Sequence, residues 1–236
     1  MKPPNPSFAL LAFFYFLLMP DGQSQEAQPK NTNAPVVHYV HGKNSISKPV
    51  HDWLQQEKAS GILVITGPRR LFDGDSVELI KQWVRRGGCL QMGLNQAGLS
   101  KDAQKDFFGQ EFGIQSKLLV AGAVSVPKEA AEHPLNRGVL RVKWMPIDTV
   151  FMQKQTPIFF GKELKTIIKM RDRYDNGILV PEGAVLGVQQ FGNGRIICWS
   201  PFEEGTEDGF RLLKNIWLWS AGLDIPAAGK IELPSK

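Results

Sequence analysis

The stretch that decides the fold is ILVITGPRRLFDGDSVELIKQWVRRGGCLQMGLN, residues 62 to 95. Its first part, Ile62 to Ile65, is a short apolar run of the kind found in strands that are buried on both faces of a parallel sheet. A helix is expected next, because apolar side chains recur on one helical face. Those side chains are Val77, Ile80, Trp83 and Val84. Cys89 to Met92 then return as a second strand.

The ends of this helix have sequence signals of their own. Asp75 is expected to cap the first turn, with Glu78 three positions later in a capping-box spacing. Gly87 is expected to end the helix, since glycine readily takes the left-handed conformation needed there. A strand, a helix and a strand over this length predict two parallel strands joined by a right-handed crossover.

The flanking segments repeat the alternation of strand and helix. Val36 to Val40 predicts a strand, and Ser47 is expected to cap the helix that follows it. Farther along, a helix is expected from Ser100 to Phe112 and a strand from Ile114 to Val120. This alternation predicts an α/β domain with a doubly wound, mainly parallel sheet.

The second half predicts an antiparallel C-terminal extension of that sheet. Gly192-Asn193-Gly194 separates two strand-like segments and is a hairpin signal, because both turn positions can take positive φ. A last helix is expected from Glu207 to Ala221. The strand-like segments are Leu164 to Met170, Ala184 to Phe191 and Arg195 to Trp199.

The N-terminal residues predict export. Residues 1–24 have the layout of a secretory signal peptide, with Lys2 before the apolar run Phe8 to Met19 and the small residue Ser24 at the expected cleavage site. The run is about 12 residues long, whereas a membrane span needs about 20, so cleavage is favoured over a retained anchor. The protein is therefore expected to be periplasmic or secreted, with only transient membrane contact through this peptide.

The rest of the chain divides into three parts. Residues 25–34 are expected to be a flexible leader, 35–223 the α/β domain, and 224–236 a loosely held tail. The formal net charge is +5, and removal of residues 1–24 leaves it unchanged because one lysine and one aspartate are lost. The two cysteines, Cys89 and Cys198, are expected at opposite ends of parallel strands, too far apart for a disulfide.

Three segments together resemble the class I glutamine amidotransferase-like superfamily, with its flavodoxin-like fold. They are Arg85-Arg86-Gly87-Gly88-Cys89-Leu90, Glu132-His133-Pro134-Leu135-Asn136-Arg137-Gly138, and Gly192-Asn193-Gly194-Arg195-Ile196-Ile197 with the helix residues 215–222. Within that superfamily the likeness is greatest to trehalose-utilisation-type (ThuA-like) proteins and related exported domains of unknown function. It covers residues 35 to 223.

The departures from this family concern its chemistry. Catalytic members place a cysteine at a sharp elbow after the strand that here is Cys89 to Met92, and pair it with a later His and Glu. The elbow here is Met92-Gly93-Leu94-Asn95, and no histidine follows His133. Release of ammonia from glutamine by a thiolate is therefore not expected, and no catalytic residue of that type is predicted.

Ligands of open α/β sheets bind beyond the carboxyl ends of the parallel strands. This rule selects the loops that follow four strands. The alternative is that the side chains of these loops are polar simply because they are solvated. A cleft with a basic rim would suit a carboxylate, a phosphate or sugar hydroxyls. The candidate ligand-binding residues are His41, Arg69, Arg70, Asn95 and Glu203.

Other candidate groups have simpler explanations. His38 and His41 would point to opposite faces of one strand, so no metal site is predicted, and no cofactor is expected. His133 precedes a proline and is expected to pack in a turn. Glu203 and Glu204 could act as acid and base, but they are more simply explained as carboxylates that complement the dipole of the last helix.

A basic stretch runs through the second half. Lys165, Lys169 and Arg171 share a parity and are expected on one strand face, where they would meet an anionic polymer or simply be solvated. Nucleic acid is not expected as a partner of an exported protein.

Three hypotheses follow. The first is an exported, non-catalytic amidotransferase-like domain that binds a partner or a small polar or anionic ligand at the strand-end cleft. The second is a carbohydrate-processing enzyme of ThuA-like type that uses His41 and a carboxylate. The third is a structural subunit of a cell-envelope complex, in contact with an envelope protein through Trp219 or the basic face. Whether the protein is an enzyme stays open, with the non-catalytic hypothesis preferred.

Overall fold

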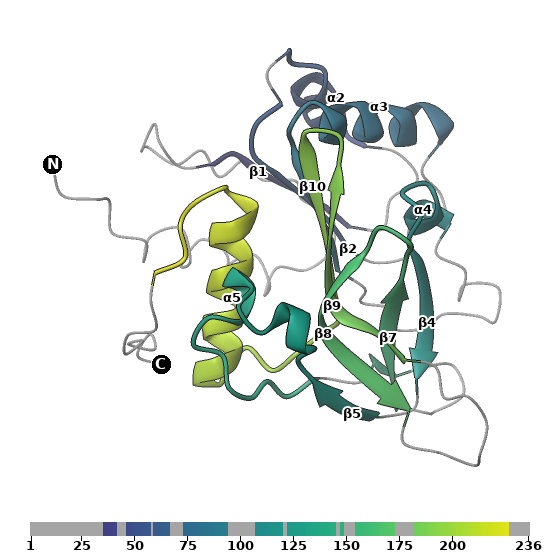
Figure 1. Cartoon of the computed structure of the whole chain (residues 1–236). Helices are drawn as coiled ribbons and strands as arrows, with labels where there is room; N and C mark the ends of the chain where they lie inside the picture. The colour runs from purple at the N-terminus through teal and green to yellow at the C-terminus, as the bar shows by residue number, and fades with distance from the viewer. Residues whose placement is uncertain are drawn as a thin grey trace, which may run out of the picture.

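The computed structural model describes residues 35–41, 46–57, 59–66, 73–93, 107–119, 122–144, 147–148, 154–172 and 182–226. A single mixed sheet runs through the molecule, with helices on both of its faces (Figure 1). The strands are β1 Val37–His41, β2 Ile62–Thr66, β3 Cys89–Gly93, β4 Gln115–Leu119, β5 Gly122–Ser125, β6 Ile147–Asp148, β7 Lys154–Phe160, β8 Lys165–Asp172, β9 Glu182–Phe191 and β10 Gly194–Trp199. The helices are α2 Lys48–Leu54, α3 Gly74–Arg85, α4 Phe107–Gln110 and α5 Glu207–Ser220, with short 3₁₀ turns η2 Lys128–Ala130 and η3 Pro134–Asn136.

One half of the sheet is parallel. Its strands lie in the order β1, β2, β3, β10, and each pairs with its neighbour in parallel. All five residues of β3 are buried, as is usual for a central strand of a parallel sheet. The central strand–helix–strand unit is therefore the one expected from residues 62 to 95.

The other half is antiparallel and is larger than expected. β9 forms a hairpin with β10, and β7 and β4 continue beyond β9. β8 also pairs with β9, and β5 pairs with β8. The α/β fold class, with a parallel core and an antiparallel extension, is confirmed. The segment expected as the next strand of the doubly wound core, β4, instead lies antiparallel to β7 at the far end of this extension.

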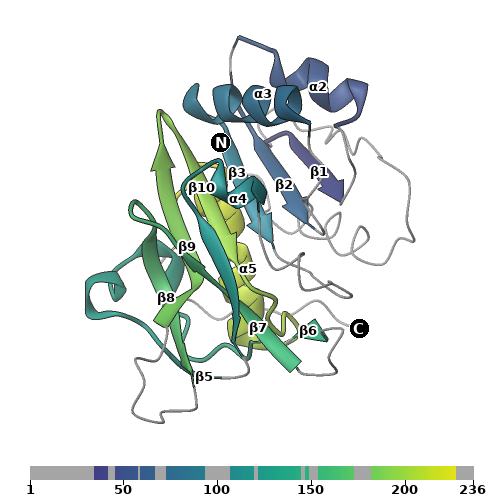
Figure 2. The same ribbon diagram turned by 90° about the vertical axis from the view of Figure 1, so that its right-hand side faces the viewer.

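The sheet divides the core into two sides, and different helices cover each side (Figure 2). α2 and α3 cover one side of the parallel strands, where the rings of Trp53 and Trp83 lie 4.8 Å apart. α5 covers the other side, and its Leu212, Leu213 and Ile216 pack with residues of β8, β9 and β10. No helix in the described part of the chain is long and apolar enough to cross a bilayer.

The cap of α3 differs from the one expected. Asp73, not Asp75, is the N-cap residue, and its side chain accepts a hydrogen bond from the Ser76 backbone N–H at 2.7 Å. Asp75 instead lies in the first turn, where its carboxylate faces the positive end of the helix dipole. The expected helix is correct, but it begins at Gly74, one residue before the predicted cap.

The basic face expected on β8 does not form, because the strand contains a β-bulge. Thr166 pairs with Gly187, whereas Ile168 pairs with Leu186, so Ile167 is an extra residue. A bulge of this kind breaks the alternation of faces. Lys165 consequently lies opposite Val188, whereas Lys169 lies opposite Ala184. Val188 packs in the core on the α5 side of the sheet, and Ala184 packs in the core on the other side. The two lysines are thus on opposite faces, and Lys169 forms an ion pair with Glu182.

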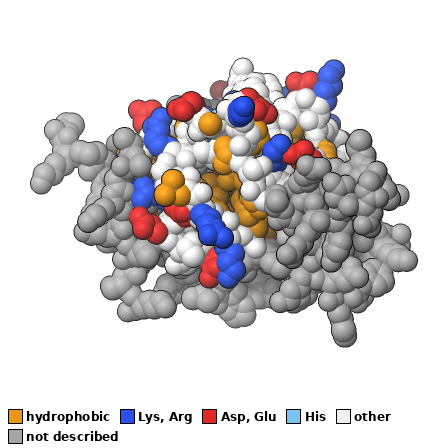
Figure 3. Space-filling model, turned by 60° about the horizontal axis from the view of Figure 1, so that its bottom comes forward, with side chains coloured by type: hydrophobic (Ala, Val, Ile, Leu, Met, Phe, Trp, Pro, Cys, Tyr) orange, Lys and Arg blue, Asp and Glu red, His pale blue; other side chains and the backbone are white. Residues whose placement is uncertain are grey.

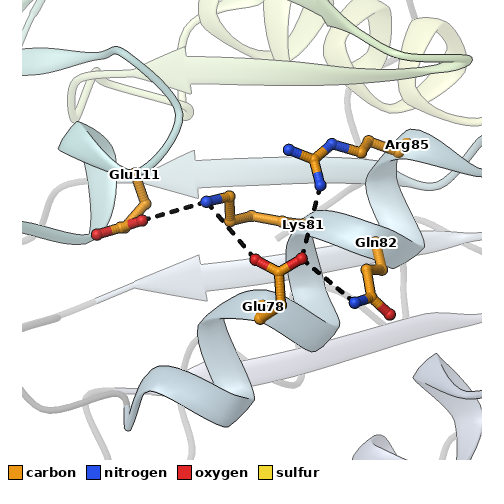
Figure 4. Close-up of polar contacts among 5 residues, drawn as sticks. All are labelled: Glu78, Lys81, Gln82, Arg85 and Glu111. Carbon is orange, nitrogen blue, oxygen red and sulfur yellow. Dashed lines mark hydrogen bonds and ion pairs between the residues drawn. The ribbon is translucent and has the colours of Figure 1, made fainter.

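Charged side chains on α3 form a surface network with the segment after α4 (Figure 4). The ammonium of Lys81 lies 3.7 Å from the Glu78 carboxylate and 3.3 Å from that of Glu111. Glu78 also contacts Arg85 at 3.6 Å and accepts a hydrogen bond from Gln82 at 3.2 Å. Such exposed pairs contribute only about 0–1 kcal/mol each, so this face is a solvated helix surface.

Neither cysteine forms a disulfide, and both are buried. Cys89 begins β3 and is aligned with Arg195, whereas Cys198 lies near the end of β10 and is aligned with Met92. The two thiols therefore lie at different levels of adjacent parallel strands, as the sequence predicts.

Candidate functional site

The carboxyl ends of the four parallel strands meet at one edge of the sheet. His41 is aligned with Thr66, Ile65 with Met92, and Trp199 with Gly93, so β1, β2, β3 and β10 end at the same level. The arrowheads of these strands accordingly point to one side of the molecule (Figure 2). Any ligand site of the usual α/β type would be built from the segments that follow these ends. We call this place the strand-end edge.

Only part of the expected site can be described. His41 is the last residue of β1, although nothing is described of its side chain. Arg69, Arg70 and Asn95 lie outside the described residues. Glu203, four residues after the end of β10, is the one predicted site residue whose side-chain contacts are described.

Glu203 is held in an ion pair. Its carboxylate lies 2.9 Å from the ammonium of Lys143, and its backbone N–H donates to the Lys143 carbonyl at 2.7 Å. The next residues on each segment, Trp144 and Phe202, form an isolated antiparallel bridge. Residues 141–144 are thereby attached to the chain that leaves β10, and Glu203 is engaged in that attachment.

Glu204 differs from its neighbour. Among the described residues its carboxylate has neither an ion-pair partner nor a hydrogen-bond donor, and burial raises its pKa above the ordinary value. The sequence points to both glutamates, and it predicts ligand binding for Glu203 alone of the two. The sequence does not indicate which of two adjacent glutamates will form an ion pair with a lysine from another segment.

Three aromatic rings lie at the end of β10. Phe202 is in edge-to-face contact with Trp144, with centroids 5.5 Å apart, and with Trp199, with centroids 6.0 Å apart. The indole N–H groups of Trp144 and Trp199 are buried and find no acceptor in the described structure. A buried donor without a partner costs about 1–3 kcal/mol. Sequence reasoning missed this aromatic cluster, because Trp144 is distant in the chain from Trp199 and Phe202.

The first turn of α5 also lies at the strand-end edge, and it is acidic. Thr206 caps the helix by accepting from the Gly209 backbone N–H at 3.1 Å. Glu207 and Asp208 occupy the first turn, where they complement the helix dipole. Asp208 also accepts a hydrogen bond from the Arg141 backbone N–H at 2.6 Å. The helix start is therefore already supplied with negative charge and offers no anion site.

Both thiols of the chain are buried in the described structure. The chain has two cysteines, and Cys89 lies at the opposite end of β3 from Gly93. Burial raises the pKa of Cys89 to about 12, although a hydrogen bond with Ser220 and the charge of Arg195 act in the other direction. Cys198 is buried within β10.

Within the described ranges, no three His, Cys, Asp or Glu side chains gather as metal ligands would.

His133 packs in a turn. Its Nδ1 accepts from the Leu135 backbone N–H at 3.3 Å and so caps η3, and its ring centroid lies 6.1 Å from that of Trp219. Burial, with a smaller effect from the charge of Lys165, lowers the pKa of His133 to about 4. The ring is consequently neutral in the folded protein at pH 7.

Acid is expected to destabilise the protein through His133. The unfolded chain binds a proton near the ordinary pKa of 6.5, whereas the folded chain binds it only near 4. The contribution of the neutral ring is therefore complete above pH 6.5 and is lost as the pH falls towards 4. Because the ring is only half-buried, solvent screening limits this loss to about 1–2 kcal/mol.

Urea unfolding at several pH values between 7.5 and 4.5 would measure this effect. The variant His133→Asn keeps a capping acceptor but cannot be protonated in this range. The stability advantage of the wild type over His133→Asn should shrink as the pH falls. A difference that stays constant would contradict the explanation.

No family model matches this sequence, and no curated protein matches it. Several solved structures are similar in shape. A protein from Bacteroides uniformis ATCC 8492 described as ThuA-like is 16% identical, with a TM-score of 0.47 over 76% of this chain and 77% of that one. A cytoplasmic protein from Salmonella typhimurium is 14% identical, with a TM-score of 0.40 over 72% of this chain and 78% of that one.

The cold-adapted β-galactosidase from Rahnella sp. R3 is 12% identical, with a TM-score of 0.46 over 74% of this chain. The match spans only 24% of that enzyme's chain. Such distant likenesses assign neither a fold nor a function. The fold class therefore depends on the strand order and pairing described above.

Proposed function

We propose that this protein is a non-catalytic, amidotransferase-like binding domain whose ligand or partner sits at the strand-end edge. The observation that carries the proposal is a scaffold without its nucleophile. Four parallel strands end together at this edge, while both thiols of the chain are buried within strands. The resemblance to ThuA-like proteins supports the same placement, because ligands of open α/β sheets bind at this edge.

The proposal uses the polar side chains that follow the strands. Arg69 and Arg70 follow β2, Asn95 follows β3, and His41 ends β1. Two arginines and an amide would supply hydrogen-bond donors for a carboxylate, a phosphate or sugar hydroxyls. Glu203 contributes indirectly, since its ion pair with Lys143 fixes the segment 141–144 beside the edge.

Calorimetric titration of the purified protein with inorganic phosphate, glucuronate and maltose would test the placement. At least one probe should bind, and the double substitution Arg69→Ala and Asn95→Ala should weaken that binding at least about tenfold, as expected for the loss of two hydrogen-bonding groups. A matched control is Lys128→Ala with Gln110→Ala, because both residues are exposed and lie on other elements. Equal binding by the double variant and the wild type would contradict the proposed site.

Export is part of the proposal, because residues 1–24 have the layout of a signal peptide. N-terminal sequencing of the protein recovered outside the cytoplasm should begin at Gln25. Recovery of the intact chain in the cytoplasmic fraction alone would argue against export.

A further inference from the structure

A segment of the chain runs antiparallel to α5 and reaches the end of β10. The carbonyl of Arg137 accepts from the Asn215 side chain in the second half of α5, and farther along the Arg141 backbone N–H donates to Asp208 in the first turn. We call residues 138–144 the strap. β10 runs downward from its hairpin in Figure 1, so the end of this strand belongs to the face seen in Figure 3. There, apolar side chains reach the surface between side chains of both charges.

The chain immediately before the strap is firmly held. The buried amide of Asn215 donates to the carbonyl groups of Leu135 and Arg137. The Arg137 guanidinium also donates to the Ile225 carbonyl. Gly138 then begins the strap with a φ of +69°. Because glycine takes positive and negative φ at similar cost, the backbone can turn here without moving the residues that Asn215 holds. Gly138 is therefore suited to be the hinge of the strap.

The far end of the strap is held mainly by surface contacts. The side chain of Lys143 is 75% exposed and that of Glu203 is 40% exposed, so salt screens their ion pair. One backbone hydrogen bond joins the same two residues. Between the two ends, Leu140 is 93% exposed, so the closed strap gains no burial from this side chain. These attachments are weaker than the buried hydrogen bonds that hold the chain before Gly138.

Trp144 has two opposing effects on the closed strap. Its ring is in edge-to-face contact with Phe202 and is only 8% exposed, and burial of this apolar surface favours closure. Its indole N–H, however, is buried without an acceptor in the described structure. A donor in this state is destabilising, and opening would return it to water. The closed strap is thus held by one apolar contact that carries a penalty of its own, which makes local opening accessible from the folded state.

We propose that the strap is a salt-sensitive latch over the end of β10. It opens at Gly138. Opening releases Lys143 from Glu203, and it also ends the bridge between Trp144 and Phe202. The closed strap occupies Glu203, which the sequence predicts as a ligand-binding residue, so opening frees this carboxylate at the strand-end edge. The inference rests on the proposed function for this consequence, because the latch affects binding only if a ligand sits at that edge.

Hydrogen–deuterium exchange of the purified protein measures the opening, when it is read by mass spectrometry on a peptide that covers residues 139–144. Raising NaCl from about 0.01 M to about 1 M shortens the Debye length from about 30 to about 3 Å. Exchange of this peptide should then become about twofold to fivefold faster, as for the loss of one exposed ion pair. A peptide that covers residues 133–137 should not change, because Asn215 holds that turn.

Glu203→Gln removes the ion pair without salt. It should speed exchange of residues 139–144 by a similar factor at low salt, and added salt should then have little further effect. The matched control is Glu129→Gln, which changes an exposed carboxylate on η2 and should exchange like the wild type. Thermal unfolding of each variant shows whether it is folded.

A reversible cross-link closes the latch by a different means. Lys143 and Glu203 lie opposite each other beside the bridge of Trp144 with Phe202. The Cα atoms of such a pair are about 5.5 Å apart, which a disulfide can span. In the double variant Lys143→Cys with Glu203→Cys, the oxidised protein should exchange residues 139–144 about fivefold more slowly than the reduced protein, because the disulfide restricts opening.

The outcomes separate the latch from the proposed binding function. Exchange that responds neither to salt nor to Glu203→Gln, or that is equal in the oxidised and reduced double variant, would overturn the latch whether or not a ligand binds. Salt-dependent exchange of the strap, together with no binding of phosphate, glucuronate or maltose, would retain the latch and reject the proposed function.

Discussion

Replacing Gly194 by alanine should lower the free energy of unfolding by about 3 kcal/mol or more. A Cβ atom at this position would lie 2.0 Å from the carbonyl oxygen of Val84 and 2.4 Å from that of Gly88. Both are backbone atoms, at the end of α3 and just before β3, so no side-chain rotation can relieve the overlap. Overpacking of this kind forces backbone shifts, which typically cost 1–3 kcal/mol and sometimes more.

Chemical denaturation of the wild type and Gly194→Ala would measure the loss. Gly205→Ala is a matched control, because a Cβ atom there would meet nothing within 4 Å. The control should unfold close to the wild-type denaturant concentration. If the two variants were equally stable, the close approach between the hairpin and α3 would not be a constraint on the fold.

Replacing Asn215 by alanine should cost about 2–4 kcal/mol. This side chain of α5 is 3% exposed, and its amide donates to the carbonyl oxygens of Leu135 and Arg137 at 3.1 and 3.0 Å. Its loss leaves both carbonyl groups without these donors and opens a cavity, and each effect costs about 1–3 kcal/mol.

Asn215→Asp separates the hydrogen bonds from the packing. The carboxylate has nearly the same size but no donor, and it would face two carbonyl oxygens, so it should be at least as destabilising as alanine. Lys214→Ala, one position earlier in α5, provides the control and should change stability by less than about 0.5 kcal/mol. Equilibrium unfolding in urea would rank the variants, and near wild-type stability of Asn215→Asp would contradict the proposed role of the amide.

These two contacts explain what the superfamily-like motifs do in this molecule. The Gly192–Gly194 turn packs against the end of α3, where the Asn193 N–H donates to the Arg85 carbonyl at 2.9 Å and the Arg195 N–H to the Gly88 carbonyl at 3.2 Å. The turn that contains Leu135 and Arg137 is held by Asn215. The segments that resemble the superfamily thus contact one another. Their residues hold the fold together, and they need not take part in a reaction.

Much of this scaffold was predictable from the sequence, because its elements have strong apolar patterns. β2, β3, α3, β10 and α5 were expected close to their observed bounds. β7 was missed, since Pro157 lies inside it and proline weakens a strand pattern. The face of Lys165 and Lys169 was wrong because a bulge at Ile167 leaves no mark in the sequence.

The candidate site, too, could be predicted from the sequence only in part. Its location at the carboxyl ends of the parallel strands follows from topology, which the alternation of strand and helix predicts. The difference between Glu203 and Glu204 does not, because it depends on where Lys143 is placed by a segment 60 positions earlier in the chain. The partnership of Trp144 with Phe202 has the same origin in tertiary structure.

The buried thiols of Cys89 and Cys198 can serve as probes for local opening of the sheet. One thiol lies at each end of the central strand pair, and neither is accessible to an alkylating reagent while β3 and β10 stay paired. The rate at which each cysteine is labelled would therefore report the opening of its own end of the pair. Because α5 covers Cys89 through Trp217 and Ala221, the first thiol to react would show whether the sheet opens first under this helix or at the edge where a ligand would bind.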